Sequence, residues 1–160
     1  MKKSKFIVLA APSGSGKTTL VNKLLTEVKL NLEFSISATS RKPRKNEING
    51  KNYFFLSKDD FLKKIENNEF LEWEEVYKDT FYGTLVSELE ASTSKNIIFD
   101  IDVIGGLNIK KKFPNQTLTI FIKPPSIREL ESRLKKRKSE TDSSIKIRIE
   151  KAKDEILLAT

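Results

Sequence analysis

Residues 6–18, Phe-Ile-Val-Leu-Ala-Ala-Pro-Ser-Gly-Ser-Gly-Lys-Thr, decide how this chain folds. The apolar run from Phe6 to Ala10 has the length of a buried strand, and Pro12 and Gly14 interrupt it. From Lys17 onward, apolar residues return at helical spacing, at Leu20, Val21, Leu24, Leu25 and Val28. A strand, a glycine-rich loop and a helix in this order are what a phosphate-binding P-loop requires.

The chemistry of such a loop follows from its backbone. Successive N–H groups face inward and form an anion site, and the first helical turn adds its positive dipole end. Lys17 is then placed to reach the β- and γ-phosphates, and the Thr18 hydroxyl to bind Mg²⁺. Ala11 stands where the consensus Gly-x-x-x-x-Gly-Lys-Ser/Thr has its first glycine. A chance strand–turn–helix is the alternative, and the flanking strand and amphipathic helix disfavour it.

The composition narrows the chemistry further. A chain of 160 residues with 38% hydrophobic residues predicts one domain with its own core. It has no cysteine and no histidine, which excludes disulfides, thiolate metal sites and imidazole catalysis. Phosphoryl transfer suits what is left, since it depends on positioning and charge neutralisation. No apolar run approaches the ~20 residues of a membrane span, and residues 6–11 are too short for a signal peptide.

The charge balance is basic. Thirty Lys and Arg against 22 Asp and Glu give a net charge of +8. This excess favours polyanionic partners such as nucleotide phosphates, nucleic acid or an acidic membrane surface. The alternative is that most of these lysines form an ordinary solvated surface, and the charge alone does not choose between the two.

Strand and helix patterns alternate along the rest of the chain. We expect strands at residues 34–38, 53–56, 70–76, 80–83, 96–102 and 117–122, and helices at 57–67, 85–92, 103–112, 126–138 and 145–158. Ser57 with Asp60, and Ser126 with Glu129, read as helix caps, and residues 139–144 read as a loop. The alternation predicts an α/β fold with a parallel sheet, and residues 34–84 look like an inserted, strand-rich lobe.

Two carboxylates lie at the end of the apolar strand expected at residues 96–102. Asp100 and Asp102 point to one face because side chains alternate along a strand. The carboxyl ends of buried parallel strands face a ligand crevice. One acid could orient the shell of a Mg²⁺ ion and the other a base or ribose. The alternative is that they cap the following helix.

A second group of residues suits a nucleoside monophosphate. Arg41 and Arg44 present planar guanidiniums that match phosphate oxygens, with the Tyr53 hydroxyl nearby. An exposed basic loop explains the same spacing. Glu72 interrupts an apolar strand, and a carboxylate there can accept from the adjacent N1–H and N2–H₂ donors of guanine, which adenine lacks. The alternative for Glu72 is a solvent-facing acid on an edge strand.

Three arginines flank the polar loop near the end of the chain. Arg133 and Arg137 are four residues apart on one helix, and Arg148 lies on the next. Arginines around a loop can close over a transferring phosphoryl group and neutralise its charge. A solvated basic helix is the alternative, because lysines surround them.

Taken together, the motifs resemble the guanylate kinase family, a family of P-loop nucleoside monophosphate kinases. The resemblance covers nearly the whole chain in order and spacing. It is carried by Ala11-Pro-Ser-Gly-Ser-Gly-Lys-Thr-Thr19, Phe34-Ser-Ile-Ser-Ala-Thr-Ser-Arg-Lys-Pro-Arg44, Gly50-Lys-Asn-Tyr53, Glu69-Phe-Leu-Glu-Trp73, Phe81-Tyr-Gly-Thr84, Asp100-Ile-Asp102, Phe121-Ile-Lys-Pro-Pro-Ser126, Leu130-Glu-Ser-Arg-Leu134 and Ile145 to Arg148.

The resemblance implies a fold and a reaction. The fold is a P-loop NTPase fold in one domain, with a parallel core sheet flanked by helices (1–33, 85–133 and 147–160), an inserted mixed-β GMP-binding lobe (34–84) and a helical lid (134–146). The reaction is Mg·ATP + GMP to ADP + GDP in purine nucleotide metabolism, with dGMP as a further acceptor. A cytoplasmic enzyme, monomeric or homodimeric, with no membrane or specific nucleic-acid partner is implied.

The resemblance also assigns residues by matched position. It gives GMP binding to Ser37, Arg41, Arg44, Tyr53, Glu72, Tyr82, Thr84, Asp100 and Asp102, ATP binding to Ala11, Pro12, Ser13, Gly14, Ser15, Gly16, Lys17, Thr18 and Thr19, and action on the phosphates to Lys17, Arg133, Arg137 and Arg148. Magnesium falls to Thr18, with Asp100 outside its first ligand shell.

The chain departs from the family pattern at three further places. The Gly-Arg-Gly typical of the lid is Lys136-Arg137-Lys138, Ile104 replaces a usual Gln, and the sequence ends at Thr160 where the family continues with another strand and helix. These departures keep open a truncated or non-catalytic guanylate-kinase-like module, although such modules typically lose the lysine found here at position 17. A nucleic-acid-binding protein rests on the net charge alone, because the aromatics are not interleaved with Lys and Arg.

Overall fold

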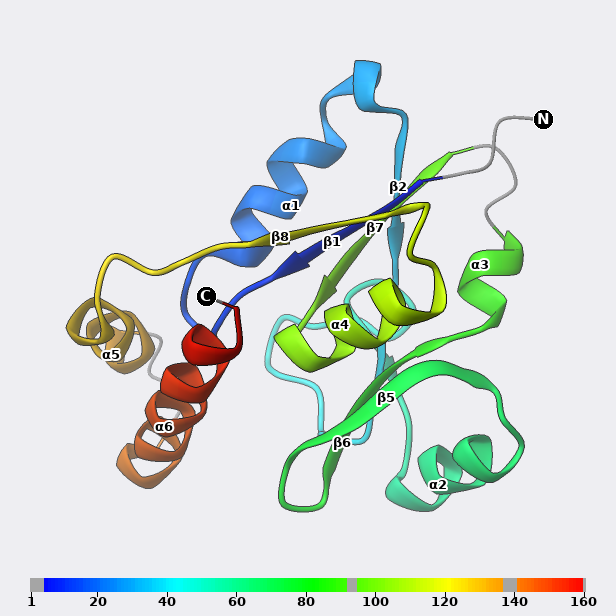
Figure 1. Ribbon diagram of the computed structural model, residues 1–160. Coiled ribbons are helices and arrows are strands. Elements are labelled where there is room, and N and C mark those ends of the chain that lie inside the picture. Colours follow the sequence, from blue (N-terminus) through cyan, green and yellow to red (C-terminus); the bar gives the residue numbers. More distant parts are fainter. Residues whose placement is uncertain (1–4, 92–94, 137–140, 160) are drawn as a thin grey trace.

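The computed structural model describes residues 5–91, 95–136 and 141–159 and contains two sheets (Figure 1). The core sheet has four parallel strands in the order β2-β7-β1-β8. These strands are β1 (Phe6–Ala10), β2 (Leu32–Ser35), β7 (Asn96–Ile101) and β8 (Thr117–Phe121). The expected parallel α/β core is therefore confirmed, and β1 with its glycine-rich loop lies in the interior of the sheet.

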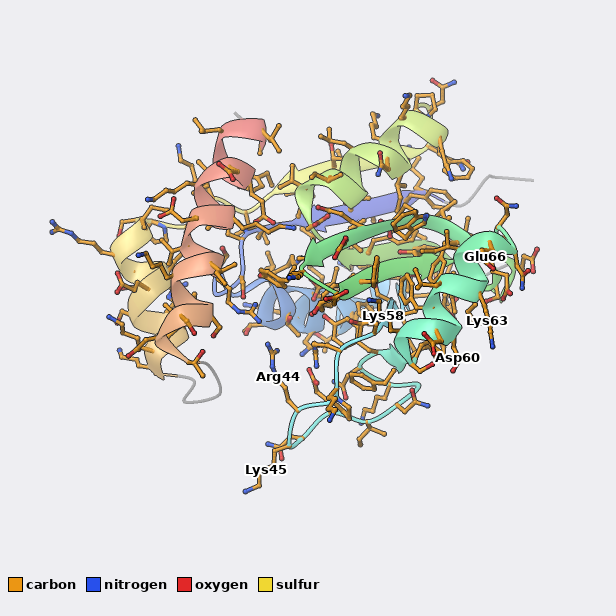
Figure 2. The ribbon with its side chains drawn as sticks, turned by 90° about the horizontal axis from the view of Figure 1, so that it is seen from below. Arg44, Lys45, Lys58, Asp60, Lys63 and Glu66 are labelled. Carbon is orange, nitrogen blue, oxygen red and sulfur yellow. The ribbon has the colours of Figure 1, made fainter. Side chains whose placement is uncertain are left out.

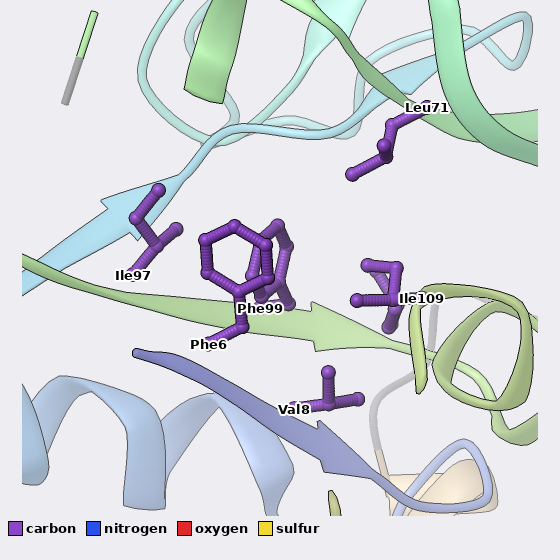
Figure 3. Close-up of a cluster of buried hydrophobic side chains, with 7 residues drawn as sticks. Phe6, Val8, Leu71, Ile97, Phe99 and Ile109 are labelled. Atoms are coloured by element: carbon purple, nitrogen blue, oxygen red, sulfur yellow. The ribbon is translucent and has the colours of Figure 1, made fainter. Parts of the chain in front are cut away.

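Helices cover both faces of the core sheet. The helix α1 (Lys17–Leu25), followed by the 3₁₀ turn η1 (Val28–Leu30), lies on one face and α4 (Val103–Lys112) on the other (Figure 1). Because side chains alternate along a strand, β1 contributes to the hydrophobic clusters on both faces of the sheet. Leu9 packs with α1, and Val8 packs toward α4. Figure 3 shows the α4-side cluster, in which Leu71 of the second sheet joins Phe6, Phe99 and Ile109. This contact ties the two sheets together beneath the site.

The second sheet is mixed and has the order β4-β3-β6-β5. Its strands are β3 (Ala38–Thr39), β4 (Phe54–Phe55), β5 (Phe70–Tyr77) and β6 (Thr80–Leu85). The pair β3 and β4 is parallel, and the other two pairs are antiparallel. The helix α2 (Lys58–Glu66) packs on this sheet through Phe61, which stacks on Phe70 at a ring distance of 4.3 Å. The short helix α3 (Ser87–Ala91) leads back to the core.

The helix signals of the sequence are confirmed where they are local. The Ser57 hydroxyl accepts the N–H of Asp60 at 3.0 Å, and the Ser126 hydroxyl accepts the N–H of Glu129 at 3.1 Å. The helix α4 has the bounds expected for it, 103–112. Each of these features depends on residues within one turn of each other, which is why the sequence alone predicts them.

The predicted strand at 34–38 is wrong, because two short strands of different sheets replace it. β2 pairs with β7 in the core sheet, whereas β3 pairs with β4 and β6 in the second sheet. Between them the N–H of Ile36 turns to the Glu88 carboxylate at 2.7 Å instead of a strand partner. The change of sheet therefore falls between Ser35 and Ala38, and residues 34 and 35 belong to the core sheet.

Three expected helices have different bounds. The helix α1 ends at Leu25, so Val28 is not part of it and lies, 90% exposed, in the separate 3₁₀ turn. Leu20 is 39% exposed, so α1 buries fewer of its apolar residues than their spacing predicts. β6 extends to Leu85, which leaves α3 to begin only at Ser87. The last helix, α6 (Asp142–Ala159), begins earlier than predicted, since the Thr141 hydroxyl accepts the N–H of Ser144 at 3.3 Å and caps its first turn. Residues 142–144 are thus helical and not part of a loop.

The helix α6 packs against α5 (Ile127–Lys136) at the carboxyl edge of the core sheet (Figure 1). Their shared apolar cluster contains Leu130, Leu134, Ile145, Ile149 and Ala152. The predicted Arg137, and the rest of the segment 137–140 between the two helices, lies outside the described residues.

Candidate active site

The loop between β1 and α1 has the backbone that its glycines predict. Gly14 has φ 93° and Gly16 has φ 89°, conformations that side chains rarely adopt. Ala11 is buried and has no positive φ, so its methyl group replaces a glycine without backbone strain. A Cβ on Gly14 would lie 3.4 Å from Leu134 Cγ, which shows that α5 backs the loop closely.

Asp100 holds the two reactive side chains that follow this loop. The Lys17 ammonium lies 2.9 Å from one carboxylate oxygen and also donates to the carbonyl oxygen of Ile101. The Thr18 hydroxyl donates to the other carboxylate oxygen at 3.0 Å. The end of β7 therefore fixes the start of α1, as expected for neighbouring parallel strands whose carboxyl ends share one edge.

A cavity of about 220 Å³ opens at this edge, between the loop, the second sheet and α6. It brings together most of the residues predicted for both nucleotides. Those lining it are Ala11 to Thr19, Ser37, Arg41, Arg44, Tyr53, Glu72, Tyr82, Asp100, Asp102 and Arg148. It is also lined by residues that the sequence did not single out, namely Glu74, Val76, Tyr77, Gly83, Ile101 and Glu155.

Glu47, which the sequence pattern did not indicate, holds the arginines of the basic loop. Glu47 accepts two hydrogen bonds from Arg41, at 2.6 and 2.7 Å, and lies 3.9 Å from Arg44. Arg41 also donates to the Tyr82 hydroxyl at 3.0 Å and lies over the Tyr53 ring. In Figure 2, Arg44 extends from its loop toward the rest of the molecule and Lys45 extends away from it. The interpretation of 41–44 as merely an exposed basic loop therefore does not fit Arg41.

Glu72 is buried and faces the cavity, so the alternative of a solvent-facing edge acid is wrong. Its side chain is 8% exposed, and its Oε1 accepts the Thr84 hydroxyl at 2.7 Å. Burial raises the pKa of Glu72 to about 7. Thr84 is itself completely buried and does not line the cavity. It therefore acts on a ligand indirectly, through its hydrogen bond to Glu72.

Asp102 both caps a helix and lines the cavity. The predicted role as a ligand-facing acid and the alternative role as a helix cap are therefore compatible. Its Oδ1 accepts a hydrogen bond from the N–H of Gly105 at 2.8 Å, at the start of α4. Its Oδ2 accepts one from the Lys151 ammonium at 3.2 Å. Burial alone would raise the pKa of Asp102, but the hydrogen bonds from Glu74 and Gly105 outweigh it and lower that pKa. Asp102 is therefore ionised at neutral pH.

Two further acids lie beside Asp102. Burial and a hydrogen bond to Asp102 raise the pKa of Glu74 to about 8. Burial raises the pKa of Glu155 to about 7. Perturbed carboxyl groups inside one cavity are typical of a functional site. Spacing could have indicated both residues, because Glu74 lies two positions from Glu72 on a strand and Glu155 lies seven from Arg148 on a helix.

The structure brings one of the three predicted arginines to the cavity. Arg148 donates to the Ser13 hydroxyl at 3.1 Å and to the Tyr77 hydroxyl at 3.2 Å, and its guanidinium lies 4.9 Å from the Tyr77 ring centre. Arg133 does not line the cavity, and its Nε donates to Glu129 at 2.7 Å on the surface of α5. Arg137 lies outside the described residues.

The donor set at the loop fits a magnesium ion. Thr18 and Asp100 offer oxygen atoms, which are the ligands that Mg²⁺ prefers, and nothing here offers a soft ligand. Within the described ranges no three acidic side chains gather into a ready-made metal cluster. In the same ranges, no helix has the length and apolar character to cross a membrane.

Comparisons with known proteins agree with this geometry. A family profile described as Guanylate kinase matches residues 3–159. Curated proteins named Guanylate kinase are 54% identical to the chain, from Porphyromonas gingivalis over 96% of this chain and 82% of that protein, and from Bacteroides fragilis over 98% and 77%. The crystal structure of guanylate kinase from Anaplasma phagocytophilum matches with a TM-score of 0.73 and 31% identity, over 96% of this chain and 70% of that one. The chain therefore belongs to the guanylate kinase family, the ATP:GMP phosphotransferases among the nucleoside monophosphate kinases.

Proposed function

We propose that this chain transfers the γ-phosphoryl group of Mg·ATP to GMP, and also to dGMP, and so forms ADP and the matching diphosphate in purine nucleotide metabolism. One observation carries the proposal: a phosphate-binding loop and a buried carboxylate suited to guanine, Glu72, line the same cavity. A site built for either nucleotide alone would need only one of these two features.

The donor nucleotide is assigned to residues 11–19. The N–H groups of the loop and the start of α1 hold the ATP phosphates, and Lys17 exchanges its contact with Asp100 for the β- and γ-phosphates. Thr18 would hold the magnesium ion, with Asp100 oriented toward it through the Thr18 hydroxyl. Bound there, the ion neutralises phosphate charge.

The acceptor nucleotide is assigned to the second sheet and its loops. Glu72 accepts the N1–H and N2–H₂ donors of guanine, whereas adenine offers no such pair of donors. Arg41, Arg44, Tyr53 and Tyr82 hold the monophosphate, with Glu47 keeping the arginines in place before the ligand arrives. Ser37, Asp100 and Asp102 complete the contacts to this nucleotide.

The transfer itself is a displacement at phosphorus. A phosphate oxygen of GMP forms a bond to the γ-phosphorus, and the bond from that phosphorus to the β,γ-bridging oxygen breaks, leaving the charge on ADP. The acceptor phosphate is already a nucleophile, so no general base is required. Lys17, Arg148, Arg133 and, from the lid segment 134–146, Arg137 neutralise the charge, and closure of the lid over the lobe 34–84 excludes water.

The test is ADP release by the 160-residue chain from Mg·ATP with GMP, dGMP, AMP, UMP or no acceptor. Release with GMP and dGMP alone is the expected result. A folded chain that binds GMP but releases no ADP with any acceptor would instead be a non-catalytic relative. Release that is equal for AMP and GMP would remove the role given to Glu72.

A further inference from the structure

Lys151 on α6 contacts three acidic residues that line the cavity. Its ammonium lies 3.2 Å from Asp102 Oδ2, 3.3 Å from Glu74 Oε1 on β5 and 4.0 Å from Glu155 Oε1 one turn further along α6. We refer to Glu74, Asp102, Lys151 and Glu155 as the α6 cluster. None of its four side chains is more than 21% exposed, so solvent screens these charges only weakly.

The two oxygens of Asp102 have different partners. Oδ1 is fixed by the backbone N–H of Gly105, which belongs to the start of α4. Oδ2 is held by the Lys151 side chain, which comes from a different element and from a residue 49 positions away. The helix cap therefore anchors one end of the carboxylate, and Lys151 decides where the other end points.

The charge of the α6 cluster makes this contact necessary. Three carboxyl groups converge on one ammonium, and among the described residues Lys151 is the only Lys or Arg within ion-pair distance of Glu74 or Asp102. Glu74 Oε2 is buried and receives no hydrogen bond from any described donor. Without the cation, the free oxygen of Asp102 would keep only its hydrogen bond with Glu74, which would draw the Asp102 carboxylate toward β5 and away from its present position.

The carboxylates of Asp102 and Glu72 both lie next to Gly105. A Cβ built on Gly105 would lie 2.7 Å from Glu72 Oε2 and 3.2 Å from Asp102 Oδ1, so the two carboxylates flank the same glycine. Two acceptors side by side suit an edge of a base that carries adjacent donors. In guanine the ring N1–H and the exocyclic 2-amino group form such an edge.

We propose that Lys151 is a positioning residue of the acceptor site, which holds Asp102 against the pull of Glu74 so that Asp102 accepts from the 2-amino group of the base. This inference rests on the proposed function, because it takes a guanine nucleotide as the acceptor. Lys151 does not touch the reacting phosphates. Its effect is therefore on recognition of the 2-amino group and not on the rate of transfer.

The experiment compares GMP with inosine monophosphate, which has the N1–H but lacks the 2-amino group. In Lys151→Met, KM for GMP is expected to rise about tenfold, the amount that one charge-assisted hydrogen bond provides, while kcat and KM for the inosine nucleotide change less than about twofold. Lys151→Arg keeps the cation and restores KM for GMP. The matched control is Lys153→Met on the solvent side of α6, where the lysine pairs with Glu150, and it should leave both constants unchanged.

A second variant tests the role of Glu74 directly. In Glu74→Ala/Lys151→Met the side chain that draws Asp102 away is absent, so most of the GMP affinity should return. Lys151→Leu, which also lacks a donor, replaces Lys151→Met if melting curves show that the methionine variant does not fold.

Either of two results would overturn the proposal: an unchanged KM for GMP in Lys151→Met, or equal losses for GMP and the inosine nucleotide. The latter would mean that Lys151 only supports the fold. Calorimetric Kd values for both nucleotides measure the same ratio without turnover. A wild-type chain that binds GMP but does not transfer phosphate would thus contradict the proposed function and still decide this inference.

Discussion

At the scale of single residues, Lys17 is the side chain whose contacts must change most when ATP binds. In the free protein it is held by Asp100 and the carbonyl of Ile101, both at the end of β7. Lys17→Ala should lower kcat by at least about 100-fold, because a preorganised cation at the transferring phosphoryl group is lost. The melting temperature should change by only a few degrees, since the lysine is at the surface of a cavity. Near-normal transfer by the variant would remove Lys17 from the mechanism.

Glu72 makes acceptor binding depend on pH. Burial raises its pKa to about 7, so the carboxylate that accepts from guanine becomes protonated as the pH falls through that value. We expect kcat/KM for GMP, which reports the free enzyme, to fall below pH 7, with about a tenfold loss for each pH unit well below it. Glu72→Gln should have a low kcat/KM that no longer varies in this range. A wild-type profile that is flat from pH 8 to pH 5.5 would contradict the role of Glu72.

At the scale of elements, the start of α4 has two adjacent glycines with separate tasks. A Cβ on Gly105 would lie 2.7 Å from Glu72 Oε2, whereas a Cβ on Gly106 would lie 2.9 Å from Val8 Cγ1 in the core. Gly105→Ala should therefore raise KM for GMP several-fold by displacing Glu72. Gly106→Ala should cost about 1–3 kcal/mol of stability through overpacking and leave KM unchanged. Kinetics and melting curves of the two variants check this, and the reverse assignment of effects would refute it.

The sequence predicts those elements whose signals are contained in a few neighbouring residues. The loop at 11–19, the caps at Ser57 and Ser126 and the bounds of α4 are of this kind. The division of residues 34–38 between two sheets is not, because β2 pairs with β7 and β3 pairs with β6, each more than 40 residues away along the chain. No local pattern reports which distant strand will pair.

In the candidate site, too, the sequence predicts residues that stand out locally and misses those whose partners are distant in the chain. Arg41, Glu72 and Asp102 could be predicted because each is an unusual residue for its place in a strand or loop. Glu47 and Lys151 could not, since a Glu in a polar loop and a Lys on a basic helix look ordinary until folding sets them against Arg41 and Asp102. Their importance comes from packing between elements and is not visible in either element alone.

At the scale of the whole molecule, the site makes the free protein less stable at alkaline pH. The pKa values of Glu72 and Glu155 are raised to about 7 and that of Glu74 to about 8, each first of all by burial, from an ordinary 4.5. A raised carboxyl pKa means that the native state binds more protons than the unfolded state between these limits. Stability from these three groups is therefore present below about pH 4.5 and is lost as the pH rises to 8.

Acids with lowered pKa values act in the opposite direction and in another range. The hydrogen bond from Arg41 lowers the pKa of Glu47, and the hydrogen bond from Lys135 lowers the pKa of Glu131 on the surface of α5. Their contributions are lost as the pH falls below about 4.5. The two sets together place the greatest stability of the free protein near pH 5. We expect its melting temperature to be about 4 °C or more higher at pH 5.5 than at pH 8.5, which corresponds to roughly 1–2 kcal/mol.

Calorimetric melts without nucleotide, from pH 4 to pH 9, measure this profile. Glu155→Gln should flatten the alkaline side, because a neutral amide replaces a buried carboxylate, whereas Glu131→Gln should leave that side unchanged. A melting temperature that rises steadily from pH 5.5 to 8.5 would mean that these acids ionise without cost in the folded chain. Saturating GMP should lower the pH at which Glu72 loses its proton, because the bound base donates to its carboxylate. The loss of stability at alkaline pH is thus expected to be smaller in the complex than in the free protein.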